Sequence, residues 1–338
     1  MMTRRMADNR GVRSTTIGLA ALAWCALAVP TSAQFPPATF NPGIYYRLPN
    51  MDNPGARLAR LNDPLLPEIH MAPVGWDMCG DQVVFPSPQD PEGLVLTPAV
   101  GEPRLVLPVG IFRIVRPSFS PDCRRVAVQA SATQGIVGGV EDLNIYVIDV
   151  ETGAVLRVGD LSWNEESPRF FPVGNRLAYS SFSPTEGVNL HVYDFDRGRE
   201  VLRAPGIGAL QIAISPNGDR VLDPRTMRIY DAATGAVTAD FLAALVATLP
   251  ATGFALDERF KDPPGNPNRG LYPLDASFSP DGTHVVLDWA LRQGDRYGNV
   301  LMRLSLDARQ LTVLTDLIPT NPDFTNRNNY SQLNPVWK

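Results

Sequence analysis

Lysine and histidine are scarce in this chain of 338 residues. It contains two lysines, Lys261 and Lys338, and three histidines, and its formal net charge is −5 at pH 7. The other cations are arginines, and they nowhere gather into a basic tract. Because binding to a phosphate backbone depends on clustered lysine and arginine that release counterions, this composition argues against a nucleic-acid partner.

Long apolar runs are also lacking, with one short exception near the start. Residues 17–29 are apolar, small residues follow as far as Ala33, and four arginines precede the run: Arg4, Arg5, Arg10 and Arg13. This order is typical of a secretory signal peptide, whereas a transmembrane helix needs about 20 apolar residues. We therefore expect residues 1–33 to be a cleaved signal peptide and the mature product to be periplasmic or secreted, without a stable membrane span. The alternative is an uncleaved anchor.

A short phrase recurs along the chain. Its copies are GWDMCGDQVVF, SFSPDCRRVAV, RFFPVGNRLAY, AISPNGDRVLD and SFSPDGTHVVL, aligned on Trp76, Phe119, Phe170, Ile214 and Phe278. Each copy has a turn of Ser, Pro, Asp or Asn, and Gly, in which Pro presets φ and Gly accepts a positive φ. An alternating strand, a strand ending in Asp with a Gly turn, and a last strand follow. Such four-stranded units form the blades of a β-propeller.

The two ends of the chain complement each other. The segment NPVW at 334–337 matches RPSF at 116–119, so Trp337 begins a further unit, and residues 43–50 and 56–63 supply its outer strands. Pairing strands from both ends would close the ring and remove the open sheet edge. We therefore predict an all-β fold, a six-bladed propeller of four-stranded antiparallel blades, with residues 34–338 as a single domain.

An insertion interrupts the fourth blade at residues 240–270. Its first part has helical spacing of apolar residues, with Asp240 as a cap and Pro250 as a stop: Phe241, Leu242, Leu245, Val246 and Leu249. Residues 261–270 have the composition of an exposed loop. Two interpretations stay open: a binding surface or lid, or a plug or decorative loop over one mouth of the channel.

The turn phrase resembles the TolB-type, or WD40-like, β-propeller repeat, whose core is close to P-x-[FW]-S-P-D-G. Residues 278–282 match it fully, and residues 119–122 match with Cys123 in place of Gly. The similarity covers about residues 71–338, and the few preceding mature residues leave no room for the separate α/β domain of TolB. The resemblance implies an exported propeller that presents loops to a protein or peptide partner.

Common catalytic motifs are missing from the sequence. It has no G-x-S-x-G, H-E-x-x-H, P-loop or C-x-x-C motif. His70, His191 and His284 lie far apart in or beside expected strands, which favours positions facing solvent or a blade interface. We therefore assign no catalytic, cofactor-binding or metal-binding residue and favour a noncatalytic scaffold, while the question of enzymatic activity stays open.

Calcium and sugar binding are the remaining alternatives. Asp194 and Asp196 are spaced as at the start of a calcium loop, but the third ligand and the distal Glu are missing, so a turn is the better interpretation. Other exported six-bladed propellers are calcium-dependent lactonases, so a calcium-dependent hydrolase or lactonase with a site on the channel is the alternative function. Trp163, Trp289 and Tyr297 could instead stack on a sugar, although such aromatics usually pack between blades.

Cysteine is scarce as well. Of the three cysteines, Cys25 lies in the expected signal peptide, which leaves Cys79 and Cys123 in an exported chain. Both lie at equivalent turns of adjacent blades, and Cys123 replaces a glycine that accepts positive φ. We predict a Cys79–Cys123 disulfide, with two free buried thiols as the alternative if the turns lie more than about 7 Å apart.

Overall fold

The structure is a computed structural model. It describes residues 44–50, 55–61, 70–71, 75–87, 93–98, 103–132, 143–159, 165–183, 187–206, 212–224, 226–256, 273, 275–319 and 335–337. The expected signal peptide at 1–33 and the expected loop at 261–270 lie outside the described residues. Residues 37–338 form one compact unit. No helix in the described part of the chain has the length and apolar character to cross a membrane.

The described strands form antiparallel sheets, which we name in chain order. Blade 1 consists of β4 (Asp77–Cys79), β5 (Gln82–Pro86), β6 (Leu94–Pro98) and β7 (Arg104–Val106). Blade 2 consists of β8 (Phe112–Phe119), β9 (Arg125–Ser131), β10 (Leu143–Asp149) and β11 (Val155–Arg157). Blade 3 consists of β12 (Glu165–Phe170), β13 (Arg176–Ser183), β14 (Gly187–Asp194) and β15 (Arg199–Pro205).

Two further blades and a closing sheet follow. Blade 4 consists of β16 (Ala213–Ile214), β17 (Arg220–Asp223), β18 (Arg228–Asp231) and β19 (Val237–Asp240). Blade 5 contains β20 (Ala255–Leu256), β21 (Asp275–Phe278), β22 (His284–Gln293), β23 (Arg296–Ser305), β24 (Leu311–Val313) and β25 (Ile318–Pro319). The closing sheet has the order β26 (Val336–Trp337), β1 (Ile44–Asn50), β2 (Gly55–Arg60), β3 (His70–Met71).

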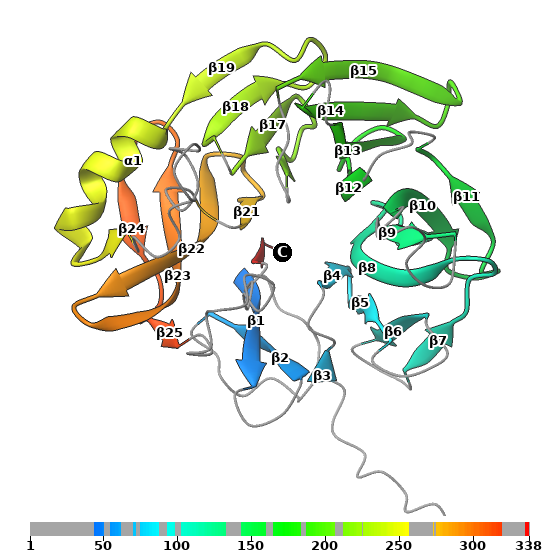
Figure 1. Ribbon diagram of the computed structural model, residues 1–338, viewed down its shortest axis with the longest axis horizontal. Coiled ribbons are helices and arrows are strands. Elements are labelled where there is room, and N and C mark those ends of the chain that lie inside the picture. The colour runs from blue at the N-terminus through cyan, green and yellow to red at the C-terminus, as the bar shows by residue number, and fades with distance from the viewer. Residues whose placement is uncertain are drawn as a thin grey trace, which may run out of the picture. The chain divides into compact units, whose positions relative to one another are not determined.

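The inner strands of the sheets, such as β4, β8, β12 and β21, lie nearest to the centre of the unit (Figure 1). Contacts between these inner strands join β4 to β8, β8 to β12, β12 to β16, β16 to β21, and β21 to β26. The closing sheet takes β1 and β26 from opposite ends of the chain, with Ile44 paired to Trp337. The propeller architecture is therefore confirmed, and strands from the two ends pair as the sequence predicted.

The predicted count of six four-stranded blades is wrong. The described residues form five blades and the closing sheet rather than six equal blades. The closing sheet and blades 1 to 4 have four strands each, and blade 5 has six. Its central strands β22 and β23 have ten residues each and extend beyond β21 and β24. The N–H and C=O groups of their extended parts therefore need other partners. The short strands β20 and β25 occupy those places, on β22 and β23 respectively.

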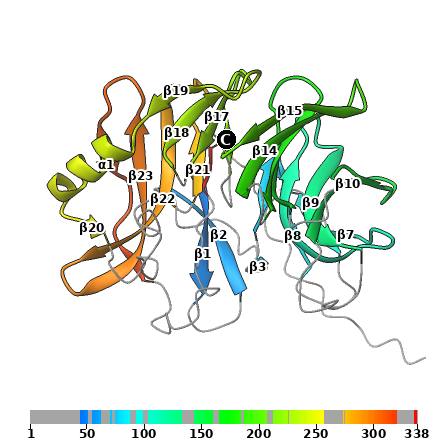
Figure 2. The same ribbon diagram turned by 45° about the horizontal axis from the view of Figure 1, so that its top comes forward.

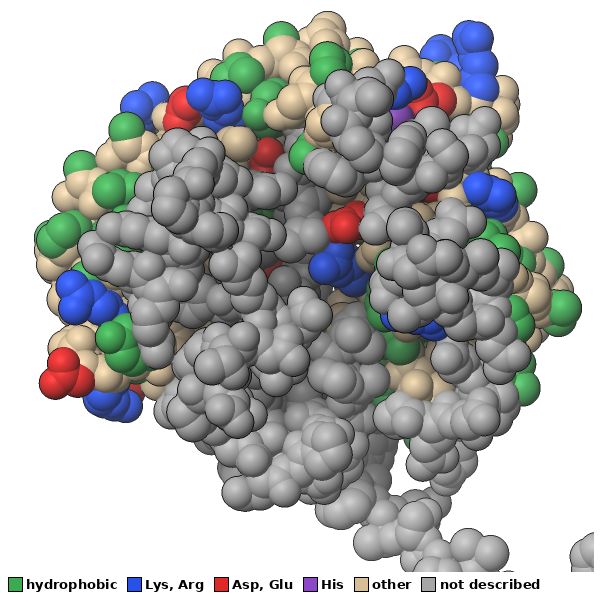
Figure 3. Space-filling view, in the orientation of Figure 1, with side chains coloured by type: hydrophobic (Ala, Val, Ile, Leu, Met, Phe, Trp, Pro, Cys, Tyr) green, Lys and Arg blue, Asp and Glu red, His purple; other side chains and the backbone are tan. Residues whose placement is uncertain are grey.

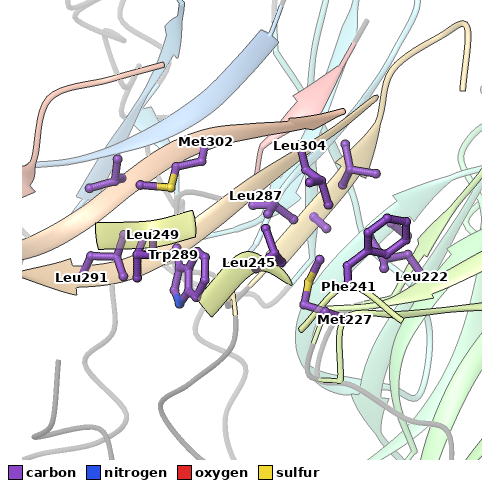
Figure 4. Close-up of a cluster of buried hydrophobic side chains, with 14 of the residues drawn as sticks. Leu222, Met227, Phe241, Leu245, Leu249, Leu287, Trp289, Leu291, Met302 and Leu304 are labelled. Atoms are coloured by element: carbon purple, nitrogen blue, oxygen red, sulfur yellow. The ribbon is translucent and has the colours of Figure 1, made fainter. Parts of the chain in front are cut away.

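Apolar side chains fill the space between neighbouring sheets. One cluster joins blades 1 and 2, a second joins blades 2 and 3, and a third joins blades 3 and 4. The cluster between blades 4 and 5 includes Leu222, Leu287, Trp289 and Met302 (Figure 4). Burial on both faces explains why the middle strands are apolar almost throughout rather than strictly alternating.

The recurring phrase forms a turn held by its serine. The Ser279 hydroxyl donates to Asp281 Oδ1 (2.5 Å) and accepts from the backbone N–H of His284 (3.0 Å), while Gly282 N–H donates to the Ser279 carbonyl (2.8 Å). Ser120 makes the same bonds to Asp122 and Arg125. Gly282 has φ +69°, and Cys123 at the equivalent position has φ +59°. The predicted positive φ of Cys123 is thus confirmed.

The described part of the insertion is neither a lid nor a plug. Helix α1 (Leu242–Thr248) and the 3-10 helix η1 (Leu249–Thr252) lie beside blade 5, away from the central strands (Figures 1 and 4). Phe241, Leu245 and Leu249 are buried in the same cluster as Trp289. The predicted helix is confirmed, although Phe241 rather than Asp240 is its N-cap and Pro250 lies within η1. The buried residues of this segment belong to the core of blades 4 and 5.

Candidate functional site

A hollow lies where the inner strands of blades 1 to 3 meet. Its lining residues are Gly75, Trp76, Arg116, Pro117, Ser167, Pro168 and Arg169. Its cavity volume is about 10 Å³, roughly the space of one water molecule. Small-molecule pockets usually hold about 300 to 1,000 Å³, so the hollow is a shallow depression that can take the tip of a side chain or a chain end but not a cofactor. Side chains of both charge signs are visible near the centre of the space-filling view (Figure 3).

The backbone takes the left-handed conformation at three equivalent places around this hollow. Gly75, Arg116 and Ser167 occupy equivalent positions, each three residues before the inner-strand residue that pairs with the second residue of the next strand. Their φ values are +107°, +51° and +57°. Positive φ is costly for residues with a Cβ and tends to persist at functional sites. The strands β8 and β12 also shift register at Arg116 and Ser167, which re-aims their side chains.

Arg116 links blades 2 and 3 at the hollow. Its Nη1 donates to Glu166 Oε2 (3.3 Å) and to Ser167 Oγ (3.4 Å). The side chains of Arg116 and Glu166 are each 24% exposed, so a partner can reach both charges. An ion pair at the surface contributes only about 0 to 1 kcal/mol, so a ligand carboxylate could compete with Glu166 for the guanidinium.

Asp77 and Ser118 hold the inner strands in place beside the hollow. Asp77 Oδ2 accepts from the N–H of Phe119 in blade 2 (2.8 Å), and Ser118 Oγ accepts from the N–H of Phe170 in blade 3 (3.3 Å). Burial raises the pKa of Asp77, and the nearby Arg169, the N–H groups of Phe119 and Met78 and the Ser118 side chain oppose that rise. Both side chains accept hydrogen bonds from backbone N–H groups of an innermost strand, which has no neighbouring strand on its inner side.

His191 and His284, the histidines whose side chains the structure describes, do not form a common site. His191 is fully buried within blade 3, where Nε2 lies 2.8 Å from Ser181 Oγ and Nδ1 lies 2.7 Å from Glu200 Oε2. Of the two positions expected for His191, facing solvent or a blade interface, the structure excludes the solvent-facing one, and the ring stacks on Tyr179 of the cluster between blades 2 and 3. The row of Ser181, His191 and Glu200 resembles a Ser-His-acid triad. Ser181 is only 3% exposed, however, so its hydroxyl is buried from a substrate in solution. The Nδ1 of His284 bonds to Thr283, and the side chain of His70 lies outside the described part.

The carboxylates considered as calcium ligands act in turns. Asp194 Oδ1 accepts from the N–H groups of Asp196 and Arg197, both at 3.0 Å. Asp149 and Asp231 accept in the same way at their own turns. Within the described ranges, no cluster of three His, Cys, Asp or Glu side chains is arranged to hold a metal ion.

Arginines connect the turns of successive blades. Arg176 Nη2 donates to the Gly218 carbonyl (3.3 Å), and Arg220 Nη2 donates to the Gly282 carbonyl (3.1 Å). Their guanidinium groups also lie over Phe171 and Phe278. Each arginine begins the second strand of one blade and reaches the positive-φ turn position of the next.

The first junction in this series has cysteines instead. Gln82 begins the second strand of blade 1, where blades 2 to 4 have arginine. The structure joins Cys79 of blade 1 to Cys123, the positive-φ position of blade 2, with Cα atoms 5.6 Å apart. That separation lies within the range that a disulfide can span.

The residues around the hollow were missed at the sequence level. Arg116 and Ser167 each precede a proline, and residues before proline are driven out of the right-handed helical region. That local signal indicates an unusual backbone conformation but not that φ is positive. The contact from Arg116 to Glu166 joins residues 50 positions apart, which no spacing within a single repeat indicates.

Comparisons with known proteins find similarity in structure only. No protein-family model matches the chain, and no curated protein matches it. Among solved structures, TolB from Acinetobacter baumannii is 20% identical with a TM-score of 0.54, covering 89% of this chain and 67% of that one. A chain of the nidogen/laminin complex is 11% identical with a TM-score of 0.50, covering 88% and 98%. These similarities establish a β-propeller fold like that of the TolB propeller.

Proposed function

We propose that this chain is an exported, noncatalytic propeller scaffold that binds a protein or peptide partner at the hollow and through neighbouring face loops. Export rests on the signal-peptide pattern of residues 1–33, which directs the product to the periplasm or the exterior. A propeller fold alone does not define function. The proposal therefore depends on the hollow itself.

The observation that carries the proposal is the strained, charged inner rim. Arg116 and Ser167 keep a left-handed backbone with Cβ atoms, and Gly75 provides the same conformation in blade 1. A Cβ at Gly75 would lie 3.1 Å from Arg116 Cα, so the two strands approach closely there. The hollow is shallow and has a mixed lining, with Trp76 and two prolines beside two arginines, and Arg116 is partly exposed, which suits the tip of a peptide side chain or a chain end. The nidogen/laminin structure was itself determined as a complex between proteins.

Affinity capture from envelope extract tests the proposal. The tagged wild-type protein is compared with Arg116→Glu and with the control Arg104→Glu, which reverses an exposed charge on the outer strand β7. We expect Arg116→Glu to lose its partner at least tenfold and Arg104→Glu to retain it. Equal capture by both variants, or no specific partner for the wild type, would refute the proposal.

A further inference from the structure

The β22–β23 hairpin of blade 5 extends beyond the rest of its sheet. Both strands have ten residues and stay paired to the tip, where Gln293 faces Arg296 across Gly294 and Asp295. By comparison with these ten residues, the first and fourth strands of the other described blades are only two to eight residues long. The hairpin projects from one end of blade 5, as the turned view makes clear (Figure 2).

The projecting part is braced on both edges. Strand β20 pairs with Leu291 and Arg292, and β25 pairs with Gly298 and Asn299. A Cβ at Gly298 would lie 2.2 Å from the Ile318 carbonyl oxygen, so glycine allows β25 to approach this closely. An isolated two-stranded hairpin is marginally stable at best, and these extra strands supply what the projection lacks.

The core holds the base of the hairpin as well. Trp289, Leu291 and Val300 are fully buried in the cluster that includes Leu245 of α1 and Leu249 of η1 (Figure 4). The helical part of the insertion therefore packs against the base of this projection. A preordered element loses less conformational entropy when a partner binds, which is a physical reason to brace it.

The tip presents two separated arginines. Residues 292–296 are all exposed. Arg292 pairs across the hairpin with Tyr297 and Arg296 with Gln293, so the two guanidinium groups belong to opposite faces. No carboxylate of the described residues forms an ion pair with either of them. Asp295 lies between them in the sequence, so residues 292–296 carry two positive charges and one negative charge, a formal charge of +1 on a braced tip in a chain of net charge −5.

We propose that the β22–β23 tip is a second contact surface and takes an acidic protein segment, with carboxylates bound by Arg292 and Arg296. Arginine offers planar, bidentate geometry to carboxylates, and a braced hairpin fixes where its arginines lie. This inference rests on the proposed scaffold function, but it concerns a different surface from the hollow.

Site-specific photo-crosslinking tests the inference. Benzoylphenylalanine replaces Gln293 at the tip or, as a control, the exposed Val237 on the outer strand β19. We expect a crosslinked protein from position 293 only, with the crosslinked peptide rich in Asp and Glu. Equal capture at both positions, or a crosslinked peptide that is neutral or basic, would overturn it.

Charge reversal provides the matched test of chemistry. The Arg292→Glu, Arg296→Glu double variant should lose that crosslink at least tenfold, while the Arg104→Glu, Arg199→Glu double variant carries the same charge change at exposed outer strands and should keep it. Equal loss of the crosslink in both double variants would mean nonspecific electrostatic attraction and would overturn the inference. Hairpin-dependent binding to vesicles containing phosphatidylglycerol, without a protein crosslink, would assign the tip to a lipid surface and overturn the inference. An unchanged Tm verifies that each variant is folded.

The outcomes separate the two proposals. If the hairpin variant keeps the partner that Arg116→Glu loses, the scaffold function stands and the hairpin inference fails. If neither Arg116→Glu nor the hairpin variant changes any specific capture, the scaffold function fails as well.

Discussion

The Cys79–Cys123 link gives the sharpest stability prediction. It closes a segment of 44 residues between the turns of blades 1 and 2. Cross-linking a loop of about 44 residues lowers the entropy of the unfolded chain by an amount worth about 4 kcal/mol at 25 °C, which favours the folded state. Replacing both cysteines by serine should therefore lower the free energy of unfolding by about 4 kcal/mol.

Thermal and chemical unfolding measure this effect. For a unit of about 300 residues, with an unfolding entropy of about 2.1 cal/mol/K per residue, the loss corresponds to a fall in Tm of about 6 °C. Unfolding of the wild type in guanidinium without reductant should expose no reactive thiol from these residues. Two reactive thiols, or an unchanged Tm in the double serine variant, would refute the bridge.

The backbone at Cys123 supplies an internal control. Its φ of +59° matches Gly282 at the equivalent position, and a left-handed residue with a Cβ costs about 1 to 2 kcal/mol. A Cys79→Ser, Cys123→Gly variant should therefore recover up to about 1 kcal/mol relative to the double serine variant, after the greater flexibility of unfolded glycine is subtracted. A lower stability for the glycine variant would contradict the assigned turn geometry.

Three further predictions test other parts of the structure. Gly298→Ala should destabilise the fold by about 1 to 3 kcal/mol in urea unfolding, because its Cβ meets the Ile318 backbone, and an unchanged stability would contradict the bracing by β25. Leu245→Ala should cost about 3 kcal/mol, and a neutral result would contradict a core role for α1. Hydrogen bonds from Ser279 and Thr283 lower the pKa of Asp281 to about 2, so its stabilisation is present above the unfolded pKa near 3.9 and is lost as pH falls toward 2. Asp281→Asn should reduce the slope of unfolding free energy against pH in that window, and an unchanged slope would contradict it.

Local signals in the sequence predicted the repeating turn well. Ser, Pro, Asp and Gly act within five residues of one another, so their bonds and the positive φ at Cys123 follow from local chemistry. The alignment failed in blade 1, where Trp76 was matched to Phe119. The strand pairing puts Met78 there, opposite Val83, because the blade 1 hairpin has a turn of two residues, Gly80 and Asp81.

Nonlocal contacts set the limit of prediction. The spacing of Phe241, Leu245 and Leu249 indicated a helix, but not that the helix packs against blade 5. Strands β20 and β25 have two residues each and exist only because β22 and β23 provide edges. The hollow likewise depends on Arg116 and Glu166, which different blades bring together.

Amide hydrogen exchange with the captured partner tests binding at the hollow most directly. Protection on complex formation should concentrate in residues 75–79, 112–119 and 165–170, the inner-strand segments that carry Gly75, Arg116 and Ser167. The Arg116→Glu variant should show no added protection at the same partner concentration. Protection confined to outer strands such as β7, β11 and β19, with the inner strands unchanged, would contradict a binding site at the hollow.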